Sequence, residues 1–273
     1  MKTYVTRVST YALIMPMDNF YQKVTLAFLA VLSAACSVTA PVPGSFQAPD
    51  KTTHQIVRER VSAVVVTGRK DISSWTNQQF MIEDAPKDAD GGSAAPISDD
   101  GYFLTADHVL VGVSDKNIFI IYANGGKITT SKARAVWRSA KDDLALLHIP
   151  MKTPYYYRWS SPSRRISQGL PVIHGGMATG TKSSTGILRT GMAAESWMTR
   201  SRFFKMDIRL EPGDSGGPII DAYGNLIGIN SAVEFLIPLE TAIFIDSEGV
   251  RPNIRKVNEL IQVDRHSNPI SNR

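Results

Sequence analysis

Short apolar runs separated by turn-forming residues dominate the chain and most constrain its fold. The runs are rich in Val, Ile, Leu and aromatic residues, and Gly, Asn, Asp and Ser bound them. Such runs are typical of β-strands joined by turns. Because no helical pattern lies between them, they favour a barrel or sandwich over a parallel α/β sheet. The expected strands are Ser62–Thr67, Tyr102–Thr105, Ile118–Tyr122, Leu144–Ile149, Leu170–His174, Gly186–Thr190, Phe203–Ile208, Gly217–Ile220, Leu226–Asn230 and Ala242–Ile245.

Two segments depart from the strand pattern. The stretch from Lys70 to Ala95 is acidic and glycine-containing over residues 83–92, which indicates a long exposed loop. Near the end, four apolar residues at helical spacing follow Pro252-Asn253, which predicts one C-terminal helix packed on the domain. We expect residues 264–273 to form a flexible tail. The four apolar residues are Ile254, Val257, Leu260 and Ile261.

The composition fits a folded protein and argues against several classes. At 273 residues, with 43% hydrophobic residues, the chain is long enough for a sizeable core. A net charge of +5 without Lys or Arg runs interleaved with aromatics argues against a nucleic-acid partner. One cysteine cannot form an intramolecular disulfide. No paired His/Cys spacing or calcium-loop pattern occurs, so we expect neither a metal nor a cofactor.

The first forty residues carry an export pattern. Residues 24–35 are apolar, follow Lys23 and precede Cys36, and they are too few to span a bilayer. Their length and small-residue end are typical of a secretory signal, with Met15 or Met17 as an alternative start. The exported chain would lie in a bacterial periplasm or cell envelope. A proline-rich linker would follow over residues 41–55, with the folded domain over 56–263.

Cys36 is a candidate for lipidation and so for attachment to a membrane. The segment Ser33-Ala34-Ala35-Cys36 resembles a lipoprotein signal, although Ser33 stands where Leu is preferred. Plain cleavage after Val38-Thr39-Ala40 is the alternative, and a buried N-terminal helix is a third interpretation.

Three segments carry residues suited to hydrolysis by a side-chain hydroxyl, which needs a nucleophile, a base, a group that orients the base, and donors for the oxyanion. Ser215 lies in the segment Pro-Gly-Asp-Ser-Gly-Gly, whose glycines permit a tight turn. That turn would aim the N–H groups of Gly213 and Ser215 at one point. His108 follows an expected strand, and Asp143 precedes another.

In the order His, Asp, Ser, these segments resemble the motifs of the trypsin-like serine protease superfamily. Within it, the bacterial high-temperature-requirement (Deg-type) branch is the most similar. The further segments that carry this resemblance are Gly92-Ser93, Asp100-Gly101-Tyr102, Ser184-Thr185-Gly186-Ile187-Leu188 and Gly228-Ile229-Asn230-Ser231.

The resemblance implies an all-β fold of two six-stranded antiparallel barrels, over about residues 56–155 and 165–250. His108 and Asp143 would come from the first barrel and Ser215 from the second. The implied activity is serine endopeptidase cleavage of polypeptide substrates through an acyl-enzyme. Ser231, Ala232 and Val233 would bind the substrate backbone as an added strand. Arg209, Leu210 and Pro212 would line the side-chain pocket, and Arg209 would favour an acidic or small residue.

Three features depart from the Deg-type pattern. Pro96 removes a donor from the strand before the histidine segment, so that strand should be short or bulged. Asp214 precedes the serine, as in animal enzymes, yet no Ile-Val-Gly-Gly-like terminus is present to pair with it. That branch usually continues with PDZ domains, whereas only the expected helix and tail follow here.

Several alternatives remain at this stage. Asp142 competes with Asp143 as the group that orients the base. A glycine-flanked serine also occurs in α/β-hydrolases, but these place their histidine after the serine, where only His266 follows. His54, His148 and His266 fit surface or structural roles. His174 fits a core or rim position better than one facing the cleft, which is the alternative. A peptide-binding module of the cell envelope that retains the barrels without cleaving is the alternative function.

Overall fold

The computed structural model describes residues 47–73, 87–125, 127–160, 166–177, 184–190, 201–236 and 243–269. The expected signal segment, Cys36 and most of the expected loop before residue 87 lie outside this part. No helix in the described part is long and apolar enough to cross a membrane.

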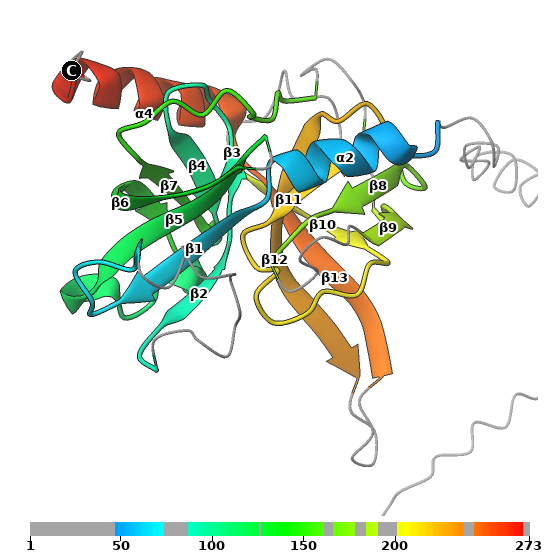
Figure 1. Cartoon of the computed structure of the whole chain (residues 1–273). Helices are drawn as coiled ribbons and strands as arrows, with labels where there is room; N and C mark the ends of the chain where they lie inside the picture. Colours follow the sequence, from blue (N-terminus) through cyan, green and yellow to red (C-terminus); the bar gives the residue numbers. More distant parts are fainter. Residues whose placement is uncertain are drawn as a thin grey trace, which may run out of the picture. The chain divides into compact units, whose positions relative to one another are not determined.

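The first half of the molecule is a sheet that closes on itself (Figure 1). Its seven strands pair in the order β2-β1-β5-β6-β7-β4-β3, all antiparallel. β2 and β3 stand at opposite ends of this order, yet Ala94 alone separates them in the chain, so the sheet forms a barrel. The strands are β1 (Ser62–Thr67), β2 (Asp90–Ser93), β3 (Ala95–Pro96), β4 (Tyr102–Thr105), β5 (Asn117–Asn124), β6 (Lys127–Ser139) and β7 (Leu144–His148).

The expected count of six strands in this barrel is therefore corrected to seven, because one barrel strand breaks at Ala94 into β2 and β3. The expected short strand at Pro96 is confirmed, since β3 is two residues long. The expected loop over residues 83–92 is wrong at its end, where Asp90–Ser93 pair with β1.

The second half is a six-stranded antiparallel sheet, as predicted. Its strands pair in the order β10-β13-β12-β11-β8-β9, and β12 and β13 form a long hairpin. The fold class predicted from the sequence, two antiparallel barrels, is confirmed. The strands are β8 (Pro171–His174), β9 (Ser184–Ile187), β10 (Arg202–Met206), β11 (Pro218–Asp221), β12 (Leu226–Leu236) and β13 (Ile243–Arg251).

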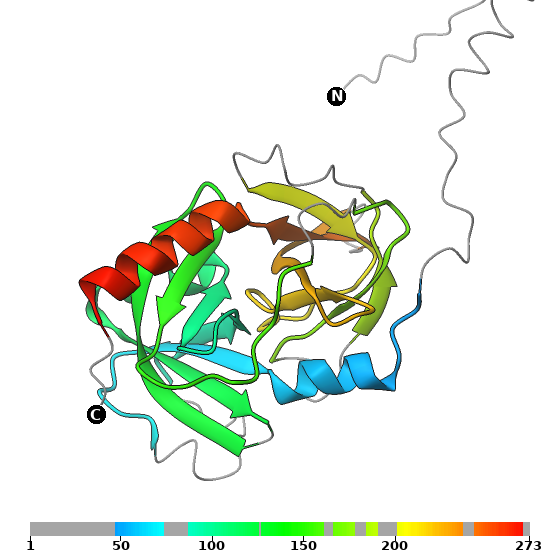
Figure 2. The same cartoon turned by 90° about the horizontal axis from the view of Figure 1, so that it is seen from above.

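In the described part of the chain, two α-helices cover the barrels, and each packs on the barrel more distant from it in sequence (Figures 1 and 2). Helix α2 (Lys51–Glu59) precedes the first barrel, but its buried Thr53 donates a hydrogen bond of 2.9 Å to Ala222 O of the second. Helix α4 (Ile254–Ser267) follows the second barrel, and its Asp264 accepts a hydrogen bond of 2.7 Å from Tyr102 of the first.

These helices correct two expectations. Residues 51–55 begin α2 and are not extended linker, because Asp50 caps the helix by accepting a hydrogen bond from Thr53 N at 2.9 Å. The flexible tail expected from Asp264 is wrong as far as Ser267, since Asp264 is 7% exposed and paired with Arg134 and Tyr102. The expected start of α4 is confirmed, with Asn253 as its cap.

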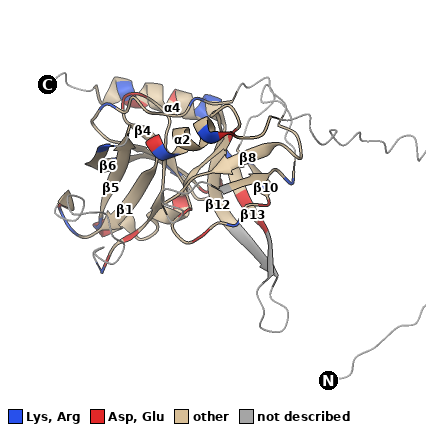
Figure 3. Ribbon diagram, turned by 45° about the vertical axis from the view of Figure 1, so that its right-hand side comes forward, with Lys and Arg blue, Asp and Glu red and all other residues tan. Residues whose placement is uncertain are grey.

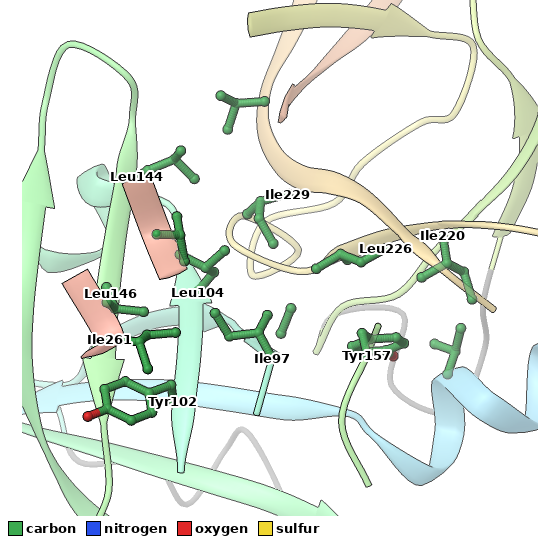
Figure 4. Close-up of a cluster of buried hydrophobic side chains, with 14 of the residues drawn as sticks. Ile97, Tyr102, Leu104, Leu144, Leu146, Tyr157, Ile220, Leu226, Ile229 and Ile261 are labelled. Atoms are coloured by element: carbon green, nitrogen blue, oxygen red, sulfur yellow. The ribbon is translucent and has the colours of Figure 1, made fainter. Parts of the chain in front are cut away.

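One apolar cluster joins both barrels and both helices (Figure 4). Leu104 and Leu144 enter it from the first barrel, and Ile220 and Ile229 from the second. Val57 of α2 and Ile261 of α4 complete it. Burial of these side chains holds the two barrels together without disulfides.

Candidate active site

His108 lies in a 3-10 turn, η2 (Asp107–Leu110), that directly follows β4. Asp107 anchors this turn because it is buried and accepts a hydrogen bond of 2.7 Å from Arg138 Nε on β6. His108 itself keeps 47% of its side chain exposed. The sequence placed His108 at the tip of a strand, and the structure adds the short turn that presents its ring to solvent.

The Asp143 carboxylate contacts both the backbone and the ring of His108. The His108 backbone N–H donates to Asp143 Oδ1 at 3.0 Å, and ring atom Nδ1 lies 3.0 and 2.9 Å from the two carboxylate oxygens. Asp142 has a different partner, because its carboxylate accepts from Ser139 Oγ at 2.9 Å. Of the two aspartates weighed from the sequence, Asp143 is the one that lies beside His108.

Ser231 reaches the same carboxylate from the second barrel. Its Oγ donates to Asp143 Oδ2 at 2.5 Å, and Ser231 is 6% exposed. The sequence assigned Ser231 only to substrate binding, so this second role was missed. The Gly-Ile-Asn-Ser segment marked the residue, but only the closed tertiary structure brings it to Asp143.

These contacts shift the pKa values of both partners in opposite directions. The hydrogen bond from Nδ1 to Asp143 outweighs burial and raises the pKa of His108 above its ordinary value. Burial alone would raise the pKa of Asp143, but hydrogen bonds from His108 and Ser231 outweigh it and lower that pKa. Asp143 is therefore a carboxylate at neutral pH, and it stabilises the protonated form of His108.

The turn that carries Ser215 has two glycines in the left-handed region, with φ of +100° at Gly213 and +85° at Gly216. A Cβ on Gly216 would lie 2.2 Å from both Ser93 O and Thr105 Oγ1, so only glycine fits. Ser215 is half-buried. Among the described residues, the N–H groups of Gly213 and Ser215 donate to no protein group.

The first barrel contacts this turn through Gly92 and Ser93 on β2. Ser93 N donates to Ser215 O at 2.7 Å. A Cβ on Gly92 would come within 2.7 Å of Ser215 O and 2.8 Å of a Val109 methyl group. Because Val109 follows His108 in η2, the backbone of Ser215 lies close to the turn that presents the imidazole.

Asp214 is fully buried beside His174. Its Oδ2 accepts from Glu211 N at 3.0 Å and lies 4.0 Å from His174 Nε2. His174 Nδ1 faces Asn230 Nδ2 at 3.1 Å, so in its neutral form the ring carries its proton on Nε2, toward Asp214. Burial lowers the pKa of His174. His174 thus lies in the core, one of the positions considered from the sequence, and the carboxylate of Asp214 has an imidazole and a backbone donor beside it.

The candidate substrate strand lies at the open end of β12. The pairing of β12 with β11 ends at Ile229, whereas its pairing with β13 continues through Ala232 and Val233 to Leu236. Beyond Ile229, β12 therefore extends past the end of β11 along one edge. An extended peptide placed there would add a strand to the sheet.

The remaining predicted substrate residues differ in exposure. Arg209 has 69% of its side chain exposed and pairs with Glu211, with 3.2 Å between Nε and Oε1. Pro212 is also exposed, whereas Leu210 is buried in the core of the second barrel. Among the described residues, no group of three or more His, Cys, Asp or Glu side chains could hold a metal ion.

Comparisons with a family model and with known proteins point to the same protein family. The family model described as trypsin-like peptidase domain matches residues 92–229, about half of the chain. The protein named "Probable periplasmic serine endoprotease DegP-like" from Hahella chejuensis is 27% identical over 259 residues, which cover 81% of this chain and 52% of that protein. The protein of the same name from Halomonas elongata is 27% identical over 163 residues, covering 56% of this chain and 33% of that protein.

Among solved structures, "HtrA-type protease AlgW with tripeptide" has a TM-score of 0.56 and 23% identity, and the match covers 80% of this chain and 65% of that one. At this identity the likeness concerns the fold. The chain spans about half the length of the Hahella protein and about a third of the Halomonas protein.

Proposed function

Since the chain belongs to the trypsin-like peptidase family, we propose that it is a serine endopeptidase that cleaves polypeptides. The observation that carries this proposal is the contact of His108 Nδ1 with the Asp143 carboxylate at 2.9 Å. Ser231 fixes that carboxylate from the second barrel. A histidine held this way by a carboxylate is the base that a serine nucleophile needs.

In the proposed reaction, Ser215 Oγ attacks the carbonyl carbon of the scissile bond and gives its proton to His108 Nε2. Asp143 stabilises the resulting imidazolium through Nδ1–H. The tetrahedral intermediate collapses when His108 returns the proton to the leaving amine, which leaves an acyl-enzyme on Ser215. Water then attacks the ester, again with His108 as base, and releases the acid product and free Ser215.

The N–H groups of Gly213 and Ser215 would stabilise the oxyanion of each tetrahedral intermediate. Their freedom from protein acceptors in the described part of the chain supports this role. Backbone donors that are oriented before the reaction stabilise developing charge at little reorganisation cost.

The substrate would bind in extended form along Ser231, Ala232 and Val233, because β12 extends past β11 there. Arg209 and Pro212 are exposed and would contact the substrate side chain, whereas Leu210 would act through the packing of its segment. An acidic substrate residue would compete with Glu211 for Arg209.

We propose that the protein acts after export, in the bacterial periplasm or cell envelope. The names of the two relatives describe them as periplasmic, and residues 24–35 have the pattern of a secretory signal. A lipid on Cys36 would attach the protein to a membrane. Metabolic labelling with a radioactive fatty acid, compared with a Cys36→Ser variant, tests that attachment.

Labelling by a fluorophosphonate probe tests the proposed activity. We expect the probe to label the wild-type chain, and mass spectrometry to place the adduct on Ser215. Ser215→Ala should give no adduct and should lower kcat on unfolded protein by about 10⁴-fold or more. Ser267→Ala, at the end of α4, is the matched control and should behave as wild type.

The proposal would be contradicted if the fluorophosphonate probe did not label the wild-type protein while that protein still bound extended peptides. That result would favour the alternative, a peptide-binding module of the cell envelope. A peptide-library digest read by mass spectrometry would also show whether Arg209 favours acidic or small residues.

A further inference from the structure

Ser93 contacts the Ser215 turn through both its backbone and its side chain. Its N–H donates to Ser215 O at 2.7 Å, and its Oγ donates to Gly213 O at 2.6 Å. These carbonyls belong to the two residues whose N–H groups would form the oxyanion hole. Ser93, a residue of the first barrel, therefore restrains the backbones of both Gly213 and Ser215.

The direction of the Ser93 hydroxyl is fixed. Its Oγ accepts a hydrogen bond from Met177 N at 2.7 Å, so its own proton is free to point at Gly213 O. Ser93 is 1% exposed, which excludes competition from bulk water at its side chain. A donor held in this way acts as a rigid restraint on its acceptor.

The Gly213 backbone needs such a restraint. A glycine at φ of +100° has wide conformational freedom, so its own preferences do not fix the orientation of the adjoining peptide groups. Asp214 N donates to Glu211 O at 3.0 Å and fixes the donor side of the peptide between residues 213 and 214. The Ser93 hydroxyl fixes the acceptor side of the same peptide.

Ser93 also connects this turn to the segment that carries His108. Thr105 Oγ1 donates to Ser93 O at 2.7 Å, and Thr105 ends β4, with Ala106 alone between it and η2. On the other side, Gly92 allows Val109 and Ser215 O to approach one another. The Gly92–Ser93 pair therefore lies between the imidazole turn and the nucleophile turn.

We infer that Ser93 is a positioning residue that holds the oxyanion-forming turn in register with His108. This inference rests on the proposed function, since it assigns a role within the same site. The sequence resemblance included Gly92-Ser93 only as a motif, without a role. The hydroxyl contact with Gly213 O provides that role.

Kinetics of Ser93→Ala test the inference on a fluorogenic peptide chosen from the library digest. Loss of the hydroxyl should lower kcat by about 10- to 100-fold and change KM by less than about threefold, because the restraint acts where charge develops. Affinity for a peptide boronic acid, which forms a tetrahedral adduct with Ser215, should fall in parallel with kcat/KM. The pH at which activity is half lost on the acid side should stay unchanged, since the His108–Asp143 pair remains.

Ser62→Ala is the matched control. Ser62 is 2% exposed on the adjacent strand β1, and its Oγ also donates to a backbone carbonyl, that of Arg60, at 3.1 Å. Its kinetic constants should equal those of wild type. A Ser93→Ala protein with kcat within twofold of Ser62→Ala would overturn the inference, and so would a fall in kcat without loss of boronate affinity.

Circular dichroism first tests whether Ser93→Ala is folded. If it is not, Ser93→Cys replaces it, because a thiol keeps the side-chain shape with a weaker donor. A folded Ser93→Cys protein with wild-type kcat would equally overturn the inference. Failure of the proposed function is distinguishable, because the wild-type chain itself would then give no fluorophosphonate adduct.

Discussion

Asp143 occupies a backbone conformation that is rare outside glycine, with φ of +46°. Asp and Asn are the residues that tolerate this region best, because their short side chains form local hydrogen bonds. Here the carboxylate accepts three kinds of donor: the backbone and ring of His108, and the hydroxyl of Ser231. The conformation is therefore used to place one carboxylate where both barrels meet.

Asp143→Asn isolates the charge of this side chain, since Asn tolerates the same backbone conformation. We expect kcat at neutral pH to fall by about 10³–10⁴-fold, because the amide neither orients the neutral ring correctly nor stabilises the imidazolium. Matched thermal melts of both proteins establish that the fold is kept.

The pH profile supplies the second readout. His108 must be neutral to act as base, and Asp143 raises its pKa, so wild-type kcat/KM should be lost as pH falls through a value above the ordinary 6.5. In Asp143→Asn this limb should move to lower pH. An unmoved limb would show that Asp143 does not determine the titration of His108.

Helix α4 shows how a single buried carboxylate fixes an element. Asp264 accepts from Tyr102 at 2.7 Å and from Arg134 Nη1 at 2.8 Å, and Arg134 Nη2 also donates to it. Arg265 adds a pair to Asp100, with Nε and Oδ2 2.7 Å apart. These contacts explain why the helix continues through residues that the sequence predicted to be flexible. Figure 3 shows that positive and negative residues both occur along α4.

Asp264→Asn should lower the free energy of unfolding by about 1.5–3 kcal/mol, because it removes a charged acceptor from the buried Tyr102 hydroxyl and from Arg134. Glu259→Gln is the control: its pair with Arg255 is exposed, and its loss should cost less than about 0.5 kcal/mol. Urea unfolding at pH 7 measures both. Equal effects would contradict a special role for Asp264.

The same carboxylate predicts a pH dependence of stability. Hydrogen bonds from Arg134 lower the pKa of Asp264 below its ordinary value of 3.8. A lowered pKa contributes stability above the unfolded value, and this contribution is lost as pH falls through the folded value. Wild type should therefore lose stability more steeply than Asp264→Asn below about pH 4. If the plots of unfolding free energy against pH were parallel for the two proteins, Asp264 would make no such contribution.

At the scale of the whole molecule, each of these two helices connects its own part of the chain to the opposite barrel. α2 begins the described chain but packs on the second barrel, and α4 ends it but packs on the first. The apolar cluster between the barrels includes residues of both helices. Each barrel also has an apolar core of its own, but the side chains in the shared cluster are buried only where the two halves of the chain meet.

We therefore expect one cooperative unfolding transition for the domain. Calorimetry on Ser215→Ala, chosen to prevent self-digestion, should give equal calorimetric and van't Hoff enthalpies. Val57→Ala in α2 and Val257→Ala in α4, both 2% exposed in wild type, should each cost about 2 kcal/mol and lower this single midpoint by several degrees. Two separated transitions in either variant would contradict the coupling.

The sequence by itself determined the residues that local physics dictates. A run of β-branched residues predicted β1, and a short aromatic and aliphatic run predicted β4, both with their observed bounds. Asn253 predicted the start of α4. Strand β6 was missed because its 13 residues contain no apolar run longer than Ala135-Val136-Trp137, although it pairs with both β5 and β7. The order of the His, Asp and Ser segments named the candidate site. The position of Asp143 directly before Leu-Ala-Leu-Leu, as in the family that the chain resembles, favoured it over Asp142.

Only the tertiary structure decided which groups meet across the barrels. The contact of Ser231 with Asp143 joins residues 88 positions apart, and that of Ser93 with Gly213 joins residues 120 apart. Hydrogen-bond partners at such separations follow from how closed barrels pack, which no local pattern records. The burial of Asp264 has the same origin, since its partners Tyr102 and Arg134 belong to the first barrel, 162 and 130 positions earlier in the chain.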